Sequence, residues 1–247
     1  MFRGIGRTSW SSPKAARNHS RSIARRQRLD LSRSGCEMNP LNLYGRWIYP
    51  ALADRALQNP DAEDARARIV SMAKGSVLEI GIGSGLNLPY YGSSVRQLVG
   101  LDPSAEMLER LRQRAKGRLE VDLLLGSAEA IPLPDAEFDT VVMTWALCGI
   151  SDPLRALSEV RRILRPEGRL LFIEHGLAPD SDVQRWQHRL DPLWTRISCH
   201  LDRPVDRLLD EAGFATGALT RRYIGAGPRF LNFMYEGWAS PSRDVET

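Results

Sequence analysis

The residues with the clearest chemical potential form a glycine-rich turn after a short apolar run. Gly81, Gly83 and Gly85 make up this turn, and Glu79 lies just before it. Glycines in such a turn let the backbone approach a ligand closely, and a following helix offers free N–H groups. Asp102 ends the next apolar run, where a carboxylate can bind both hydroxyls of a ribose. The spacing therefore predicts a site for a nucleoside-containing ligand.

The order of the glycines narrows the choice of nucleoside. The dinucleotide-binding pattern places a third glycine five residues after the first, and Leu86 occupies that position. This argues against a dehydrogenase, and a nucleoside that carries an amino acid would need no cradle for a pyrophosphate. A nucleotide-binding protein without catalysis is the alternative from another class. Intact Glu79, Gly81, Gly83 and Asp102 argue against a catalytically dead chain.

A second group of reactive residue types lies later in the chain. Glu174 and His175 end a predicted strand, where a histidine could remove a proton from an incoming thiol or amine, so His175 is the candidate catalytic residue. Cys148 follows an apolar run and is interpreted as a small buried hydrophobe. Cys36, Cys148 and Cys199 lie far apart without a CxxC pair, and the four histidines lack metal-ligand spacing. The sequence thus predicts neither a metal site nor a disulfide framework.

The apolar pattern beyond residue 75 predicts the scaffold that positions these residues. Continuous runs such as Val141–Met143 and Leu170–Ile173 indicate strands buried on both faces, as in a parallel sheet between helices. Strands are expected at 76–80, 96–101, 119–125, 138–143, 168–174, 214–222 and 229–236. Helices are expected at about 87–91, 104–116, 153–164, 180–200 and 203–212. Asp61 is expected to cap a further helix, and Arg165–Gly168 is expected to be a turn.

Charge and composition divide the chain into segments. Residues 1–37 hold nine basic residues against two acidic ones, so the rest of the chain is net negative. This leader is interpreted as an over-extended start or a disordered segment, with an organelle transit peptide or a basic arm as alternatives. Residues 38–74 are expected to form an N-terminal helical cap, 75–238 the main domain and 239–247 a disordered tail. No segment approaches the roughly eighteen apolar residues of a spanning helix.

The charge pattern also bears on partners and location. Because the excess basic charge lies in the leader, a nucleic-acid partner is not expected. Residues 41–58 read as amphipathic helix that packs on the domain or touches a membrane surface. The expected location is the cytoplasm, with membrane association through 41–58 and organelle import through 1–37 as alternatives.

Successive motifs carry a resemblance to a known family. The motifs are VLEIGIGSGLN (Val77–Asn87), VGLD (Val99–Asp102), GSAEAIPLP (Gly126–Pro134), FDTVVMT (Phe138–Thr144) and RPEGRLLF (Arg165–Phe172). Together they resemble the class I S-adenosylmethionine-dependent methyltransferases, and more narrowly the methyltransferase type 11 family. The segments Thr144–Asp152 and Glu174–His200 are similar to methyltransferase-like proteins that methylate small alkyl thiols and associate with lipid surfaces.

The resemblance implies a fold and a set of site residues. The fold is an α/β, doubly wound, seven-stranded sheet in the order 3-2-1-4-5-7-6, mostly parallel with the last strand antiparallel and with flanking helices. The cofactor is S-adenosyl-L-methionine. Its implied binding residues are Glu79, Gly81, Gly83, Gly85, Asp102, Pro103, Met107, Ala128, Glu129 and Thr144.

The leading functional hypothesis is methyl transfer to a small-molecule or lipid-like acceptor, with a thiol favoured. Phospholipid N-methylation or quinone C-methylation is the alternative within the same fold. The segment 174–200 follows the fifth strand and is expected to cross the entrance for the acceptor. Its apolar residues at helical spacing are expected to form an apolar wall there. These residues are Trp186, Leu190, Leu193, Trp194 and Ile197.

Overall fold

The structure is a computed structural model, and it describes only part of the chain. The described residues are 54–115, 120–196, 198–225 and 227–242. The expected leader at 1–37 lies outside them, as do residues 41–53 of the amphipathic segment 41–58. None of the helices among the described residues is long and apolar enough to cross a membrane.

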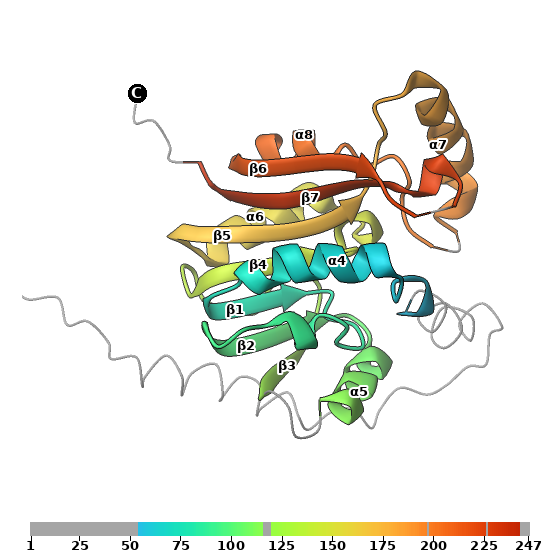
Figure 1. Cartoon of the computed structure of the whole chain (residues 1–247). Coiled ribbons are helices and arrows are strands. Elements are labelled where there is room, and N and C mark those ends of the chain that lie inside the picture. Colours follow the sequence, from blue (N-terminus) through green and yellow to red (C-terminus); the bar gives the residue numbers. More distant parts are fainter. Residues whose placement is uncertain (1–53, 116–119, 197, 226, 243–247) are drawn as a thin grey trace, which may run out of the picture. The chain divides into compact units, whose positions relative to one another are not determined.

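Seven strands form one sheet in the order β3-β2-β1-β4-β5-β7-β6 (Figure 1). Their bounds are β1 (Gly75–Ile80), β2 (Val95–Asp102), β3 (Val121–Leu125), β4 (Phe138–Thr144), β5 (Leu164–His175), β6 (Phe214–Tyr223) and β7 (Phe233–Pro241). Strands β1 to β5 pair in parallel, whereas β7 pairs antiparallel with both β5 and β6. The expected strand order and strand directions are confirmed.

Helices cover both faces of the sheet. The α-helices are α4 (Pro60–Ile69), α5 (Ala105–Arg114), α6 (Pro153–Ile163), α7 (Ser181–Trp194) and α8 (Val205–Glu211). Short 3-10 helices are η3 (Val70–Met72), η4 (Leu88–Tyr90), η5 (Leu147–Gly149) and η6 (Arg229–Leu231). Helices α4 and α5 pack in one apolar core, and α6 and α8 pack in the other. Figure 1 shows α4 in front of the sheet and α6 behind it.

The central strand β4 shows why the apolar runs are continuous. Val141 and Met143 point into the core under α6, while Val142 between them points into the core under α4 and α5. All three side chains are almost fully buried. Burial of each aliphatic side chain contributes about 1.5–3 kcal/mol, so a polar residue at any of them would destabilise the sheet.

The start of α4 differs from the expectation. Asn59, and not Asp61, caps the helix, because the Asn59 side chain accepts a hydrogen bond from Ala62 N and Pro60 occupies the first helical turn. Asp61 instead accepts a hydrogen bond from Gly225 N, far along the chain. A proline in the first turn has a preset φ angle and lacks an N–H that would have no partner there, so the cap lies two residues earlier than expected.

Other boundaries also shift. The expected turn Arg165–Gly168 lies within β5 as an irregularity: Phe138 pairs with Leu164, and Thr140 already pairs with Arg169. Helix α7 ends at Trp194 and does not continue to residue 200. The last strand begins at Phe233 because η6 occupies residues 229–231, and it runs to Pro241, beyond the expected domain end at 238.

Candidate active site

The glycine turn follows β1 at the edge where the parallel strands end. Gly81, Gly83 and Gly85 all have positive φ angles, of 67°, 55° and 82°. The requirement is strictest at Gly81, where an added Cβ would lie 2.7 Å from the Cβ of Ala146. Only glycine satisfies both the left-handed backbone and this close approach of the loop after β4. The turn thus packs closely against the loop after β4 at Gly81, whereas an added Cβ at Gly83 would meet no atom nearer than Met107 Cε at 3.4 Å.

Asp102 lies beside this turn at the end of β2. Its Oδ2 accepts a hydrogen bond of 2.9 Å from Gly83 N, and its Oδ1 accepts one of 2.8 Å from Ser104 N. The side chain is buried, and burial raises its pKa although both hydrogen bonds act in the opposite direction. Carboxylate oxygens hold further lone pairs, so Asp102 can orient the turn and accept hydroxyl donors as well.

Asn87 joins three elements around the turn. Its Oδ1 accepts a hydrogen bond of 3.0 Å from Arg66 Nε of α4. Its Nδ2 donates to Glu79 Oε1 at 2.8 Å and to Thr144 Oγ1 at 2.9 Å. Arg66, Asn87 and Glu79 are all buried. Sequence reasoning gave no role to Arg66 or Asn87, although Asn87 ends the first quoted motif.

Glu79 is the most deeply buried acid of this group. Its Oε2 accepts a hydrogen bond of 2.7 Å from the hydroxyl of Tyr91. Burial raises the pKa of Glu79 to about 7, although the hydrogen bonds from Tyr91 and Asn87 and the charge of Arg66 favour the ionised form. A cationic group bound beside Glu79 would favour its ionised form further.

The loop after β4 is held in an uncommon conformation. Trp145 has a φ of 50°, a value that bulky residues rarely adopt. Its N–H donates to Ile173 O at 2.7 Å, and the Arg66 guanidinium lies 4.7 Å from its ring centroid. The next two N–H groups, those of Ala146 and Leu147, donate to Oε1 of buried Glu174 at 2.9 and 3.0 Å. Strands β4 and β5 therefore fix this loop together.

His175 contacts cysteine side chains from two distant parts of the chain. Its Nε2 lies 3.0 Å from the Sγ of Cys199, and Cys148 lies close by with a ligand atom within 4.8 Å of both. The Nδ1 of His175 is buried without a hydrogen-bond partner. The sequence predicts no metal site, but the fold brings Cys148 and Cys199 together around His175.

Contacts among the three groups shift their pKa values. A hydrogen bond with Cys148 and the neighbouring His175 lower the pKa of Cys199 well below its usual value, although burial opposes this. The same contact with Cys199, together with burial, raises the pKa of Cys148. Burial lowers the pKa of His175, but its hydrogen bond with Cys199 and the charge of that thiolate outweigh this and raise it. The Nε2 of His175 is therefore engaged by the Sγ of Cys199.

Comparison with known proteins matches this geometry to a family. Residues 78–172 match the family model described as a methyltransferase domain, which covers the glycine turn, Asp102 and the loop after β4. A phosphatidylethanolamine N-methyltransferase of Cereibacter sphaeroides is 30% identical over 77% of this chain and 94% of its own. The chain is a type 11 methyltransferase.

Other relatives and solved structures agree with that assignment. Thiol S-methyltransferase TMT1B of Homo sapiens is 29% identical to this methyltransferase over 80% of this chain and 88% of its own. A chain in the complex between the Haloferax volcanii Trm112 activator and a putative methyltransferase is 18% identical, with a TM-score of 0.61 over 85% of this chain and all of that one. The YcgJ protein of Bacillus subtilis, also 18% identical, gives a TM-score of 0.52 over 79% of this chain and 99% of its own. The two structures support the fold.

The methyl donor of this methyltransferase is S-adenosylmethionine, which supplies an activated methyl group on a sulfonium ion. The residues present fit it. Gly83 lacks a Cβ atom, as close approach of a ligand to the backbone requires, and buried Asp102 lies beside the turn as a hydroxyl acceptor. Buried Glu79 offers a carboxylate near the same turn for an ammonium group.

The remaining expected cofactor residues take different positions. Met107, in the first turn of α5, lies next to Gly83, and Pro103 is exposed directly after Asp102. Ala128 is buried in the core under α6. The Glu129 carboxylate accepts a hydrogen bond of 2.7 Å from Asp152 N, so it also supports the start of α6.

The residues of the expected apolar wall on α7 differ in exposure, and Leu190 and Trp194 are partly buried. Trp186 and Leu193 are 57% and 63% exposed, and Ile197 lies outside the described residues. The buried residues of α7 are Val183 and Gln187 instead. Helical spacing alone does not show which face of α7 packs against the domain. The polar side chain of Gln187 lies on the buried face because backbone carbonyl groups there accept its hydrogen bonds.

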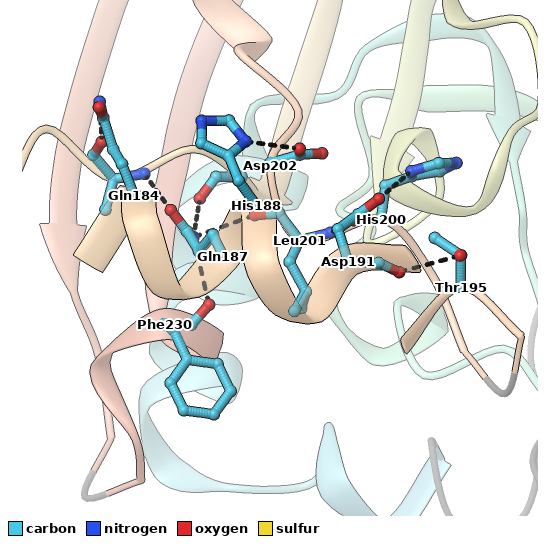
Figure 2. A network of polar contacts seen from close by, with 11 residues as sticks. Gln184, Gln187, His188, Asp191, Thr195, His200, Leu201, Asp202 and Phe230 are labelled. Carbon is cyan, nitrogen blue, oxygen red and sulfur yellow. Dashed lines mark hydrogen bonds and ion pairs between the residues drawn. The ribbon is translucent and has the colours of Figure 1, made fainter. Parts of the chain in front are cut away.

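Gln187 connects α7 to neighbouring segments by several hydrogen bonds (Figure 2). Fully buried, it accepts a hydrogen bond from Ala178 N and donates to the carbonyls of Gly176, Leu201 and Phe230. Asp191, one turn further, accepts hydrogen bonds from Leu201 N at 2.6 Å and from His200 Nδ1 at 3.1 Å. These contacts fix residues 200 and 201, directly after Cys199.

Glu79 leads to a prediction about stability and pH. The folded-state pKa of about 7 lies above the usual 4.5, so the stabilisation from protonated Glu79 is complete below about pH 4.5 and is lost as the pH rises through 7. Glu79→Gln should remove this loss, which amounts to at most about 3 kcal/mol. Tyr91, Arg66 and Asp102, the ionisable groups facing Glu79, remain in the variant.

The measurement is urea unfolding of the ligand-free protein from pH 5 to pH 8. Glu79→Gln should give a flatter dependence of the unfolding free energy on pH and exceed the wild type at pH 8. Exposed Glu211 provides the matched control, Glu211→Gln, which should follow the wild-type curve. Parallel curves for Glu79→Gln and wild type would contradict the prediction.

Proposed function

We propose that this methyltransferase transfers the methyl group to a small alkyl thiol. In this proposal Gly81, Gly83 and Gly85 receive the amino acid part of the cofactor, with Glu79 beside its ammonium group. Asp102 holds the ribose. The acceptor approaches the carboxyl ends of β4 and β5, near Thr144 and His175. Further contacts of the adenosyl group are proposed for Pro103, Met107, Ala128 and Glu129.

The observation that carries the choice of a thiol is the pairing of His175 with Cys199. An amine held as ammonium or a carbon acid needs a base to remove a proton, and the Nε2 of His175, the candidate base at this edge, is paired with Cys199. His175 Nε2 is 3.0 Å from Cys199 Sγ, and Glu174 Oε1 accepts two backbone N–H groups. A thiol has a usual pKa near 8.5, so it ionises close to neutral pH without a dedicated base.

With the acceptor ionised, the protein mainly has to position it. The loop from Trp145 to Leu147 is fixed by β5, and buried side chains surround it. A rigid edge of this kind can hold a nucleophile in line and exclude water, which lowers the barrier without further chemistry from the protein. The relatives named thiol S-methyltransferase support the same acceptor class.

Phospholipid N-methylation is the second candidate, because a relative named phosphatidylethanolamine N-methyltransferase covers most of this chain. The two candidates differ in the proton that must leave. The thiol carries one acidic proton, whereas the ammonium headgroup must lose a proton to a base before it can attack.

The test is an acceptor screen with the full chain and a labelled methyl donor. The acceptors are a short alkyl thiol, the alcohol of the same chain length, phosphatidylethanolamine vesicles and a demethylated quinone. The thiol should be labelled at least tenfold faster than any other acceptor, and Asp102→Ala should label none of them. Faster labelling of phosphatidylethanolamine than of the thiol would overturn the proposal in favour of the lipid.

A further inference from the structure

Three side chains with metal-binding atoms meet beside the acceptor edge. Cys148 comes from η5 after β4, His175 ends β5, and Cys199 lies in the segment after α7. Their ligand atoms all lie within 4.8 Å of one another, and the closest pair, His175 Nε2 and Cys199 Sγ, is 3.0 Å apart. Cys148 is almost fully buried and Cys199 is partly buried.

We propose that Cys148, His175 and Cys199 form a binding site for one zinc-type divalent metal ion. Two thiolates and one imidazole are a soft donor set, which favours zinc over the oxygen-preferring magnesium and calcium. Tetrahedral zinc takes four ligands, so three protein ligands leave one position for an exogenous group. Such an open position is typical of catalytic rather than structural zinc sites.

The backbone around the cluster is fixed by contacts that do not involve the proposed ligands' side chains. His200 N donates to Cys148 O at 2.9 Å, which ties the segment containing Cys199 to η5. Leu201, two residues after Cys199, is held by Asp191 and Gln187 (Figure 2). Glu174 anchors the N–H groups just before Cys148. Supporting contacts of this kind preorganise metal ligands and raise affinity.

The open position gives the site a role that rests on the proposed function. Because Cys199 is only partly buried, the cluster has an approach from solvent. The acceptor thiol binds there as thiolate: its S–H bond breaks, a sulfur–metal bond forms, and the proton leaves to solvent. No oxidant or reductant is needed. The metal then does for the acceptor what a base would do, at an edge where the Nε2 of His175 is engaged.

The test begins with metal binding by the full chain under reducing conditions, with zinc alone as the probe. Competition with a chelator should show about one zinc per chain. Cys199→Ser and His175→Gln should each weaken binding at least tenfold. Cys36→Ser and His188→Gln are the matched controls, since Cys36 is the remaining cysteine and His188 is exposed on α7. Both controls should bind zinc as the wild type does.

Cobalt in place of zinc allows metal binding to be followed by absorption in the wild-type protein, so this measurement does not depend on whether a variant folds. Thiolate-to-cobalt charge-transfer absorption should appear in the wild type with one equivalent of metal and be absent without it. No zinc binding and no such absorption would overturn the proposal. So would equal loss of zinc in Cys36→Ser and Cys199→Ser, or a Cys148–Cys199 disulfide as the resting state of the isolated full chain.

The outcomes separate this inference from the proposed function. Zinc bound by the cluster in a protein that methylates only phosphatidylethanolamine would leave the metal site in place and overturn the thiol acceptor. Full thiol methylation by metal-free protein would leave the proposed function in place and overturn the role of the metal. An added alkyl thiol should shift the cobalt absorption of the wild type, and its alcohol analogue should not.

Discussion

Asp102→Ala should weaken binding of S-adenosylhomocysteine by about 30-fold to 1,000-fold, equivalent to about 2–4 kcal/mol. A buried carboxylate that accepts two hydroxyl hydrogen bonds accounts for most of this loss, because hydrogen bonds to charged groups are the stronger kind. The rest comes from the turn itself, since Gly83 N and Ser104 N both lose their acceptor. Isothermal calorimetry on the full chain measures the affinity directly.

Two variants sharpen this experiment. Asp102→Asn keeps the shape of the side chain but replaces one acceptor oxygen by a donor, so its affinity should fall between wild type and Asp102→Ala. Asp122→Ala changes a carboxylate on the neighbouring strand β3, whose partner is Gln97, and should leave the affinity unchanged. An affinity of Asp102→Ala within twofold of wild type would remove Asp102 from the cofactor site.

Glu174→Ala should lower the free energy of unfolding by about 2–4 kcal/mol. Glu174 is fully buried, and its loss leaves the N–H groups of Ala146 and Leu147 without an acceptor. Each unsatisfied buried donor costs about 1–3 kcal/mol, and the removal of a buried carboxylate offsets part of the sum. Because these N–H groups follow Trp145, the strained loop beside the site should loosen as well.

Glu174→Gln distinguishes hydrogen bonding from mere packing. Only Oε1 of Glu174 accepts hydrogen bonds, and Oε2 has no partner, so a glutamine can keep its oxygen at the first position. In urea unfolding, Glu174→Gln should lose at most about half of the unfolding free energy that Glu174→Ala loses. Exposed Glu167→Ala serves as the control and should unfold like wild type. Equal destabilisation by alanine and glutamine at position 174 would show that the hydrogen bonds carry little weight.

Much of the scaffold is determined by local properties of the sequence. The runs at Val141–Met143 and Leu170–Ile173 specify strands with two buried faces, because each consecutive side chain is apolar. The glycine turn is equally local, since left-handed φ angles at Gly81, Gly83 and Gly85 need glycine whatever surrounds them. These features were sufficient to predict the sheet and a nucleoside site, and the family resemblance added the strand order and the methyl donor.

Boundaries depended on competing local signals and were predicted less well. Asn59 and Asp61 are both capable caps, and the position of Pro60 decides between them. The stripe on α7 had the period of an amphipathic helix, yet Trp186 and Leu193 are exposed. The helical period shows which residues share a face of α7 but not which face packs against the domain. Here the packed face contains Gln187, which donates hydrogen bonds to three backbone carbonyls.

The sequence by itself determined the fold class, the glycine turn and Asp102, because each depends on residues close together in the chain or on the regular spacing of successive strands. Only the tertiary structure decided what surrounds His175. Cys148 and Cys199 belong to segments after β4 and after α7, and no local pattern reports that they meet. Their meeting follows from parallel strands ending at one edge and from the hydrogen bonds of Gln187 and Asp191, which set where the chain returns after α7.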